Sequence, residues 1–79
     1  MSVCNPIKEV CFDGYKPSYT QVMKAVNEEI SKGHTDIVLH WGESSIDLYF
    51  DHRVNQWFGS GWIRDIEGSY IATELNTFS

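Results

Sequence analysis

Residues 36–51 read DIVLHWGESSIDLYFD, and apolar side chains alternate with others in both halves of this stretch. A period of two is typical of a strand with one buried face, so the stretch predicts a β-hairpin. With Gly42–Ser45 as the loop, the apolar residues share one face in the pairs Trp41–Ile46, Leu39–Leu48 and Ile37–Phe50. The other face then pairs Val38 with Tyr49 and His40 with Asp47. A slip of one residue would expose the whole apolar set, so the pattern predicts which face is buried.

Upstream of the hairpin, residues 18–33 carry the signals of an amphipathic helix. Ser18 is a good N-cap, and Gln21 three residues later completes a capping box. Apolar residues recur every four positions at Val22, Val26 and Ile30, which predicts a stripe that faces a core. Gly33 is expected to end the helix in the left-handed conformation.

Two further strands are expected beside these elements. Residues 7–12 fit a short strand at an edge of the sheet, and residues 56–63 fit a third strand of the meander. The third strand should pair Asp51 with Gln56 and place Gly59 and Gly61 on the core face, where a missing side chain lets a helix approach closely. The tail, residues 69–76, fits a short helix or an edge strand, and the helix is favoured.

These elements predict an α+β fold. A three- to four-stranded antiparallel sheet carries one long helix packed on one face, in the order β-α-β-β-β-(α). The chain of 79 residues has room for one small domain, residues 1–79, in which residues 1–6 form a flexible arm.

Composition narrows the classes of function. The net charge of −5 disfavours direct binding to nucleic acid, and no segment is long and apolar enough for a membrane. So short a chain has little room for a cofactor pocket, and we expect no enzyme activity, no cofactor and no metal. Cys4 and Cys11 match no zinc or redox spacing, which predicts reduced thiols in the cytoplasm, with a Cys4–Cys11 disulfide as the alternative.

The aromatic residues provide the strongest functional signal. Tyr49, Phe58 and Trp62 fall on the sheet face opposite the core, which a small two-layer domain usually leaves to solvent. The candidate partner-binding residues are these three rings and the polar residues around them, namely His40, Asp36, Glu43, Asp47 and Asp51. Exposed aromatic rings beside carboxylates are typical of a protein-binding surface. Two alternatives remain: one of the termini covers this face, or a homodimer buries it.

The sequence therefore predicts a non-catalytic acidic module that binds a protein partner with a basic surface. An inhibitor of a nucleic-acid-handling protein fits this description, for example a phage-encoded anti-defence protein or a toxin antidote that mimics nucleic acid. One alternative is a structural homo-oligomer or a small subunit of a larger assembly. A second alternative is a small metal-dependent or hydrolytic enzyme that uses His40 and Asp47.

Overall fold

A computed structural model describes residues 7–77 of the chain, and within them the α+β class is confirmed. The flexible arm expected at residues 1–6 lies outside the described residues, as does Cys4. The elements in chain order are β1 (Lys8–Phe12), α1 (Tyr19–Ser31), β2 (Asp36–Trp41), β3 (Ser44–Asp51), β4 (Gln56–Ile63), β5 (Ile66–Glu67) and α2 (Gly68–Thr77).

The sheet has five strands in the order β1-β2-β3-β4-β5 and is mixed, so the predicted antiparallel sheet of three or four strands is matched only in part, by β2 to β5. The strand β1 lies at the edge, as predicted, but it pairs with β2 in parallel. The reason is the connection: α1 crosses over between β1 and β2 and returns the chain in its original direction. The other three pairings are antiparallel.

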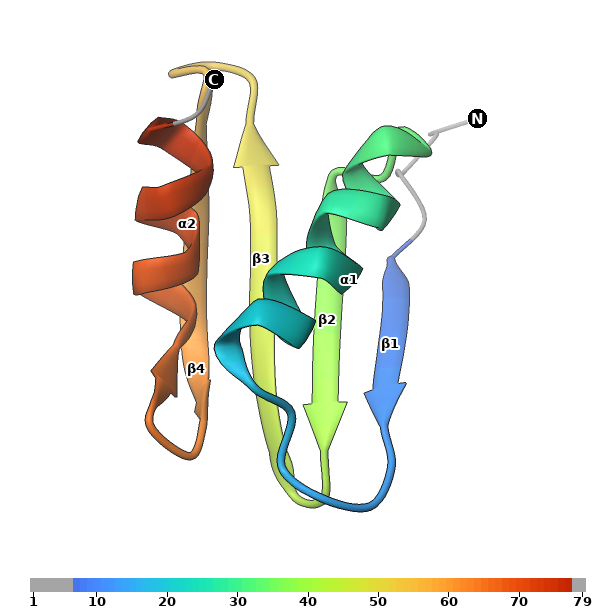
Figure 1. Ribbon diagram of the computed structural model, residues 1–79. Helices are drawn as coiled ribbons and strands as arrows, with labels where there is room; N and C mark the ends of the chain where they lie inside the picture. The colour runs from blue at the N-terminus through green and yellow to red at the C-terminus, as the bar shows by residue number, and fades with distance from the viewer. Residues whose placement is uncertain (1–6, 78–79) are drawn as a thin grey trace.

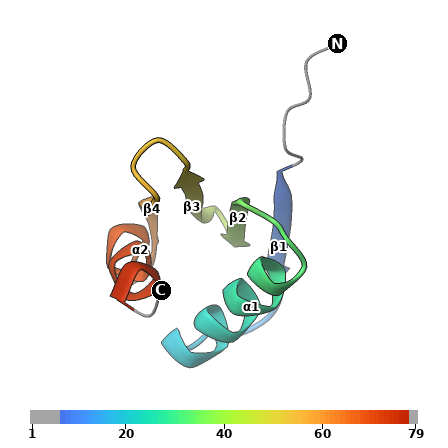
Figure 2. The same ribbon diagram turned by 90° about the horizontal axis from the view of Figure 1, so that it is seen from above.

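Both helices cover the same face of this sheet. Figure 1 shows α1 crossing in front of β3 and β2 and α2 in front of β4, and Figure 2 shows that both lie on one side. The second helix confirms the reading favoured for residues 69–76. All core residues lie between the helices and the sheet: Val22, Val26, Ile37, Leu39, Ile46, Leu48, Ile63, Ile66, Ile71, Ala72 and Leu75. The opposite face of the sheet, called the open face below, is covered by no helix within residues 7–77 (Figure 2).

The β2–β3 hairpin closes more tightly than predicted. Its turn is Gly42-Glu43 alone, and Trp41 pairs with Ser44, so the predicted register was wrong by two residues. Gly42 has a φ of 59°, which suits the first central position of a two-residue turn that continues the strand twist. The polar pair Ser44-Ser45 therefore extends the ladder instead of forming a loop. A shift of two residues preserves the faces. Of the predicted apolar set, four side chains are buried (Ile37, Leu39, Ile46 and Leu48), and Trp41 and Phe50 are half-buried.

The helix α1 has the predicted ends. Ser18 and Gln21 form the capping box, and Gly33, with a φ of 92°, donates its N–H to the carbonyl of Ile30 beyond the last turn. One buried residue was not predicted: the Glu29 carboxylate is almost enclosed, and its oxygens lie 3.6 Å from Lys32 Nζ and His34 Nε2.

The contact between β4 and the start of α2 depends on two glycines. A Cβ on Gly59 would lie 2.1 Å from the carbonyl oxygen of Gly68, and a Cβ on Gly68 would lie 2.4 Å from that of Ser60. At the other end of α2, the Asn76 amide accepts a hydrogen bond from the N–H of Trp57 (2.7 Å) and donates one to its carbonyl (3.1 Å). The helix therefore replaces the neighbouring strand that β4 lacks beyond the two-residue β5.

Candidate protein-binding face

The open face is defined by the alternation of side chains along β1 to β5. Its strand positions are Glu9 and Cys11; Asp36, Val38 and His40; Ser45, Asp47, Tyr49 and Asp51; Gln56, Phe58, Ser60 and Trp62; and Glu67. Seven of the eight predicted site residues lie on it, and Glu43 lies in the exposed β2–β3 turn. Glu9, Cys11 and Glu67 were not predicted as site residues.

The three predicted aromatic side chains are exposed, by 44% for Tyr49, 38% for Phe58 and 57% for Trp62. Tyr49 and Phe58 are direct cross-strand partners, as predicted, and their rings stack with centroids 5.6 Å apart. The C-terminal segment does not cover them through residue 77, because α2 packs on the other face (Figure 2). The alternative in which residues 1–6 cover them falls outside the described residues.

Two of the three exposed rings on the open face have an acidic residue as their cross-strand partner. Asp36 pairs with Tyr49 across β2 and β3, and Glu67 pairs with Trp62 across β4 and β5. Glu67 could not be predicted, because its strand of two residues is too short to show an alternating pattern. Phe58 and Trp62 lie four positions apart on β4, about 13 Å at the usual rise of a strand. The rings therefore form an elongated surface, with Tyr49 and Phe58 near one end and Trp62 near the other.

Asp36 and Asp47 form an acidic pair on this face. Partial burial raises the pKa of Asp36, and the neighbouring Asp47 carboxylate raises it further. Ionising Asp36 therefore costs free energy in the folded protein, and an incoming cation would reduce that cost.

We expect Asp36→Asn to stabilise the isolated protein at pH 7 by about 0.5 kcal/mol, the scale of a like-charge cross-strand pair. Because folding raises the pKa of Asp36, its ionised form is disfavoured in the fold. That cost is absent below the unfolded pKa and develops as the pH rises through the folded pKa. Urea unfolding at pH 7 and pH 3 would measure it, and an equal gain at both values would mean that charge is not the cause.

Two other predicted carboxylates, Asp51 and Glu43, are placed less favourably for binding a cationic group of a partner. Arg53 binds Asp51 through a backbone N–H at 2.9 Å and two guanidinium N–H groups at 3.2 and 3.1 Å. These hydrogen bonds lower the pKa of Asp51 and neutralise its charge locally. Glu43 lies in the β2–β3 turn, at the opposite end of β2 from Asp36. Asp36 and Asp47 are therefore the carboxylates best placed beside the Tyr49–Phe58 stack.

His40 does not face Asp47, and this predicted pairing was wrong. The tighter turn places His40 opposite Ser45 and Asp47 opposite Val38. His40 Nε2 lies 3.0 Å from an oxygen of Glu9 on β1 instead. Sequence reasoning missed this partner because the parallel pairing of β1 with β2 could not be deduced from the hairpin. The geometric premise of the enzyme alternative, a His40–Asp47 pair, is therefore absent.

Charge is distributed unequally between the two faces. Apart from His40, every charged residue at a strand position of the open face is acidic: Glu9, Asp36, Asp47, Asp51 and Glu67. The lysines lie elsewhere: on α1, at its C-cap, in the β1–α1 loop and at Lys8, whose register partner Ile37 faces the core. Arg53 and Arg64 lie in turns, where Arg53 pairs with Asp51 and Arg64 lies over the Trp41 ring.

The described residues show no sign of a metal site or a membrane span. Residues 7–77 contain no group of histidine, cysteine and carboxylate side chains arranged to hold a metal. They also contain no helix with the length and apolarity needed to cross a membrane. Comparisons with family models, curated proteins and solved structures found no match.

Proposed function

We propose that this chain is a non-catalytic protein-binding module whose open face occupies a basic surface of a partner protein. One observation carries the proposal: the exposed rings of Tyr49, Phe58 and Trp62 lie on a face whose ionised strand residues are all acidic. Aromatic anchors supply desolvated contact area, and the carboxylates favour a cationic partner and repel anionic ones.

The arrangement suits arginine better than lysine. A guanidinium group can stack on the Phe58 or Tyr49 ring and direct its N–H groups to the adjacent Asp36 and Asp47 carboxylates. The unfavourable Asp36–Asp47 pair supports this reading, since residues that cost stability in the free protein are typical of sites selected for binding. An arginine-rich surface that normally grips phosphate is the partner that these features favour.

Occupation of such a surface would inhibit a nucleic-acid-handling protein. A phage-encoded anti-defence protein or a toxin antidote is a biological role of this kind. We place this action in the cytoplasm, because a free, exposed thiol such as Cys11 suits a reducing compartment. A homodimer through the open face is less favourable, since a twofold interface would bring the same acidic surface against itself.

The test compares proteins captured from the native host by tagged wild type and by the Phe58→Ala,Trp62→Ala double variant. We expect the double variant to keep the wild-type circular dichroism spectrum and melting temperature and to lose at least about tenfold in affinity for a captured basic protein. Capture should also weaken as salt rises, because screening acts on the acidic residues.

Tyr70→Ala is the matched control, because Tyr70 is an exposed aromatic residue (54%) on α2, away from the open face. It should capture the same partner as wild type. The proposal fails if Tyr70→Ala loses the partner while the open-face variant retains it. It also fails if the open-face variant unfolds, since the two rings would then be structural.

A further inference from the structure

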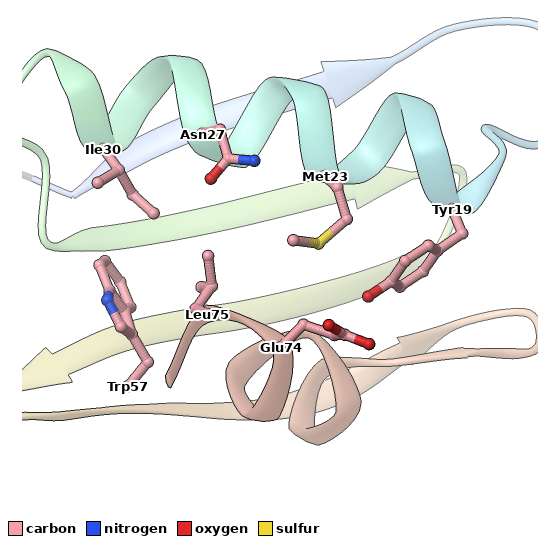
Figure 3. A pocket seen from close by; sticks show the side chains of 7 residues that line it. All are labelled: Tyr19, Met23, Asn27, Ile30, Trp57, Glu74 and Leu75. Atoms are coloured by element: carbon pink, nitrogen blue, oxygen red, sulfur yellow. The ribbon is translucent and has the colours of Figure 1, made fainter. Parts of the chain in front are cut away.

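A cavity of about 660 Å³ separates the two helices on the opposite side of the sheet from the open face. Figure 3 shows α1 as one wall, with Tyr19, Met23 and Ile30 pointing into the cavity, and α2 as the other, with Leu75 and Glu74. Trp57 of β4 closes one end. The volume is typical of a site for a small organic molecule.

The cavity is elongated and has one polar end. From Tyr19 to Ile30 the wall follows the length of α1 for about 16 Å at the helical rise per residue. Tyr19 and Glu74 lie together at one end, and Ile30 and Trp57 lie at the other (Figure 3). The side chains between them are mostly apolar, apart from Asn27. A linear ligand with one polar head would match this arrangement.

The polar end contains acceptors that lack a partner. The Tyr19 hydroxyl is buried and forms no hydrogen bond with the described residues. None of the ion pairs of residues 7–77 includes Glu74. Burial raises the pKa of Tyr19, and the nearby Glu74 charge raises it further, so the hydroxyl stays neutral and can donate or accept. A buried hydroxyl without a partner costs free energy that a bound donor group would recover.

We propose that the cavity between α1 and α2 binds an amphiphilic amine, with its ammonium group between the Glu74 carboxylate and the Tyr19 hydroxyl and its apolar chain along Met23, Leu75 and Trp57. An ammonium group has three donors and a positive charge, which satisfies both groups at once. A carboxylate or phosphate head would be repelled by Glu74, and a neutral head would leave that carboxylate without a counter-charge. This site lies on the helical side and does not depend on the proposed function.

The experiment titrates the ¹⁵N-labelled full chain with decylamine and decanoate below their micellar concentrations and with decanol below its solubility limit. The indole N–H signals of the tryptophans show where the ligand binds, because Trp57 lines the cavity and Trp62 lies on the open face. We expect decylamine to shift the Trp57 signal and leave Trp62 unchanged. Decylamine should bind at least tenfold more tightly than decanol, and decanoate should bind most weakly.

Substitutions test the polar end. Glu74→Gln should abolish the preference for decylamine over decanol while decanol still binds, and Tyr19→Phe should weaken decylamine binding several-fold. Glu28→Gln removes the same charge from an exposed position on α1 and should keep the full preference. Thermal melting would confirm that each variant folds. If a variant does not fold, the relative affinities of wild type for the three ligands still test the proposal.

Three results would overturn the proposal. The first is no movement of the Trp57 signal with decylamine. The second is equal affinity for decylamine and decanoate, which would show that Glu74 does not select the head. The third is a concentration-dependent change of the Trp57 signal without ligand, which would show that a second copy of the chain fills the cavity.

Discussion

Gly59→Ala is expected to cost about 3 kcal/mol or more of the free energy of unfolding, the upper range for overpacking a core. The new Cβ would lie 2.1 Å from the carbonyl oxygen and 2.6 Å from the carbonyl carbon of Gly68. These atoms are backbone at the start of α2, so the helix itself must move. A domain of this size has a total stability of about 4–12 kcal/mol, and the loss would be a large part of it. Urea unfolding of the variant and of wild type measures the difference.

Ser60→Ala is the matched control for Gly59→Ala. It changes the next residue of β4 at an exposed position on the open face, and it should change stability by less than about 0.5 kcal/mol. Wild-type stability for Gly59→Ala would contradict the close approach of α2 to β4.

Leu48→Ala is expected to destabilise the fold by about 2–5 kcal/mol, because it removes a fully buried side chain from the centre of the core. The range reflects how far the surroundings can collapse into the space. Thermal or urea unfolding gives the value, and Ser45→Ala, an exposed change on the same strand, should leave stability almost unaltered. A loss below about 1 kcal/mol would mean that Leu48 is not enclosed.

The effects of Gly59→Ala and Leu48→Ala on stability are expected to be coupled. A Cβ on Gly59 would lie 2.8 Å from Leu48 Cδ2, so part of the Gly59→Ala clash is with a side chain that Leu48→Ala removes. Most of the clash is with the Gly68 backbone and should persist in the double variant. In a double-mutant cycle we therefore expect the double variant to lose slightly less stability than the sum of the two single losses. If Gly59→Ala cost nothing in the Leu48→Ala background, the contact with Leu48 alone would explain its effect.

The parts of the fold that could be predicted are those with a local signal. The capping box at Ser18 and Gln21, the helix end at Gly33 and the pairing of Tyr49 with Phe58 follow from short-range patterns. The direction of β1 could not be predicted, because five residues of strand do not reveal whether their neighbour is parallel. The register of the β2–β3 hairpin was missed because Ser44 and Ser45 resemble loop residues, although a glycine followed by another residue also favours a two-residue turn.

The candidate site was also predicted only in part. The alternation of residues placed Tyr49, Asp47 and Asp36 on one face, and the structure has them there. The contact of His40 with Glu9 was not predicted, because it requires the pairing of β1 with β2. The position of Glu67 beside Trp62 was not predicted either, because it requires the pairing of β4 with β5. The cavity between the helices was not predicted, since it depends on the separation of α1 and α2 in space.

Because both helices share one side of the sheet, residues of the core and residues of the proposed binding face alternate along the same strands. Every second residue of β2, β3 and β4 can thus be substituted with little effect on the packing of the hydrophobic core. Such a scaffold is able to follow a changing target, and an engineer could diversify the same positions to obtain binders with new specificity.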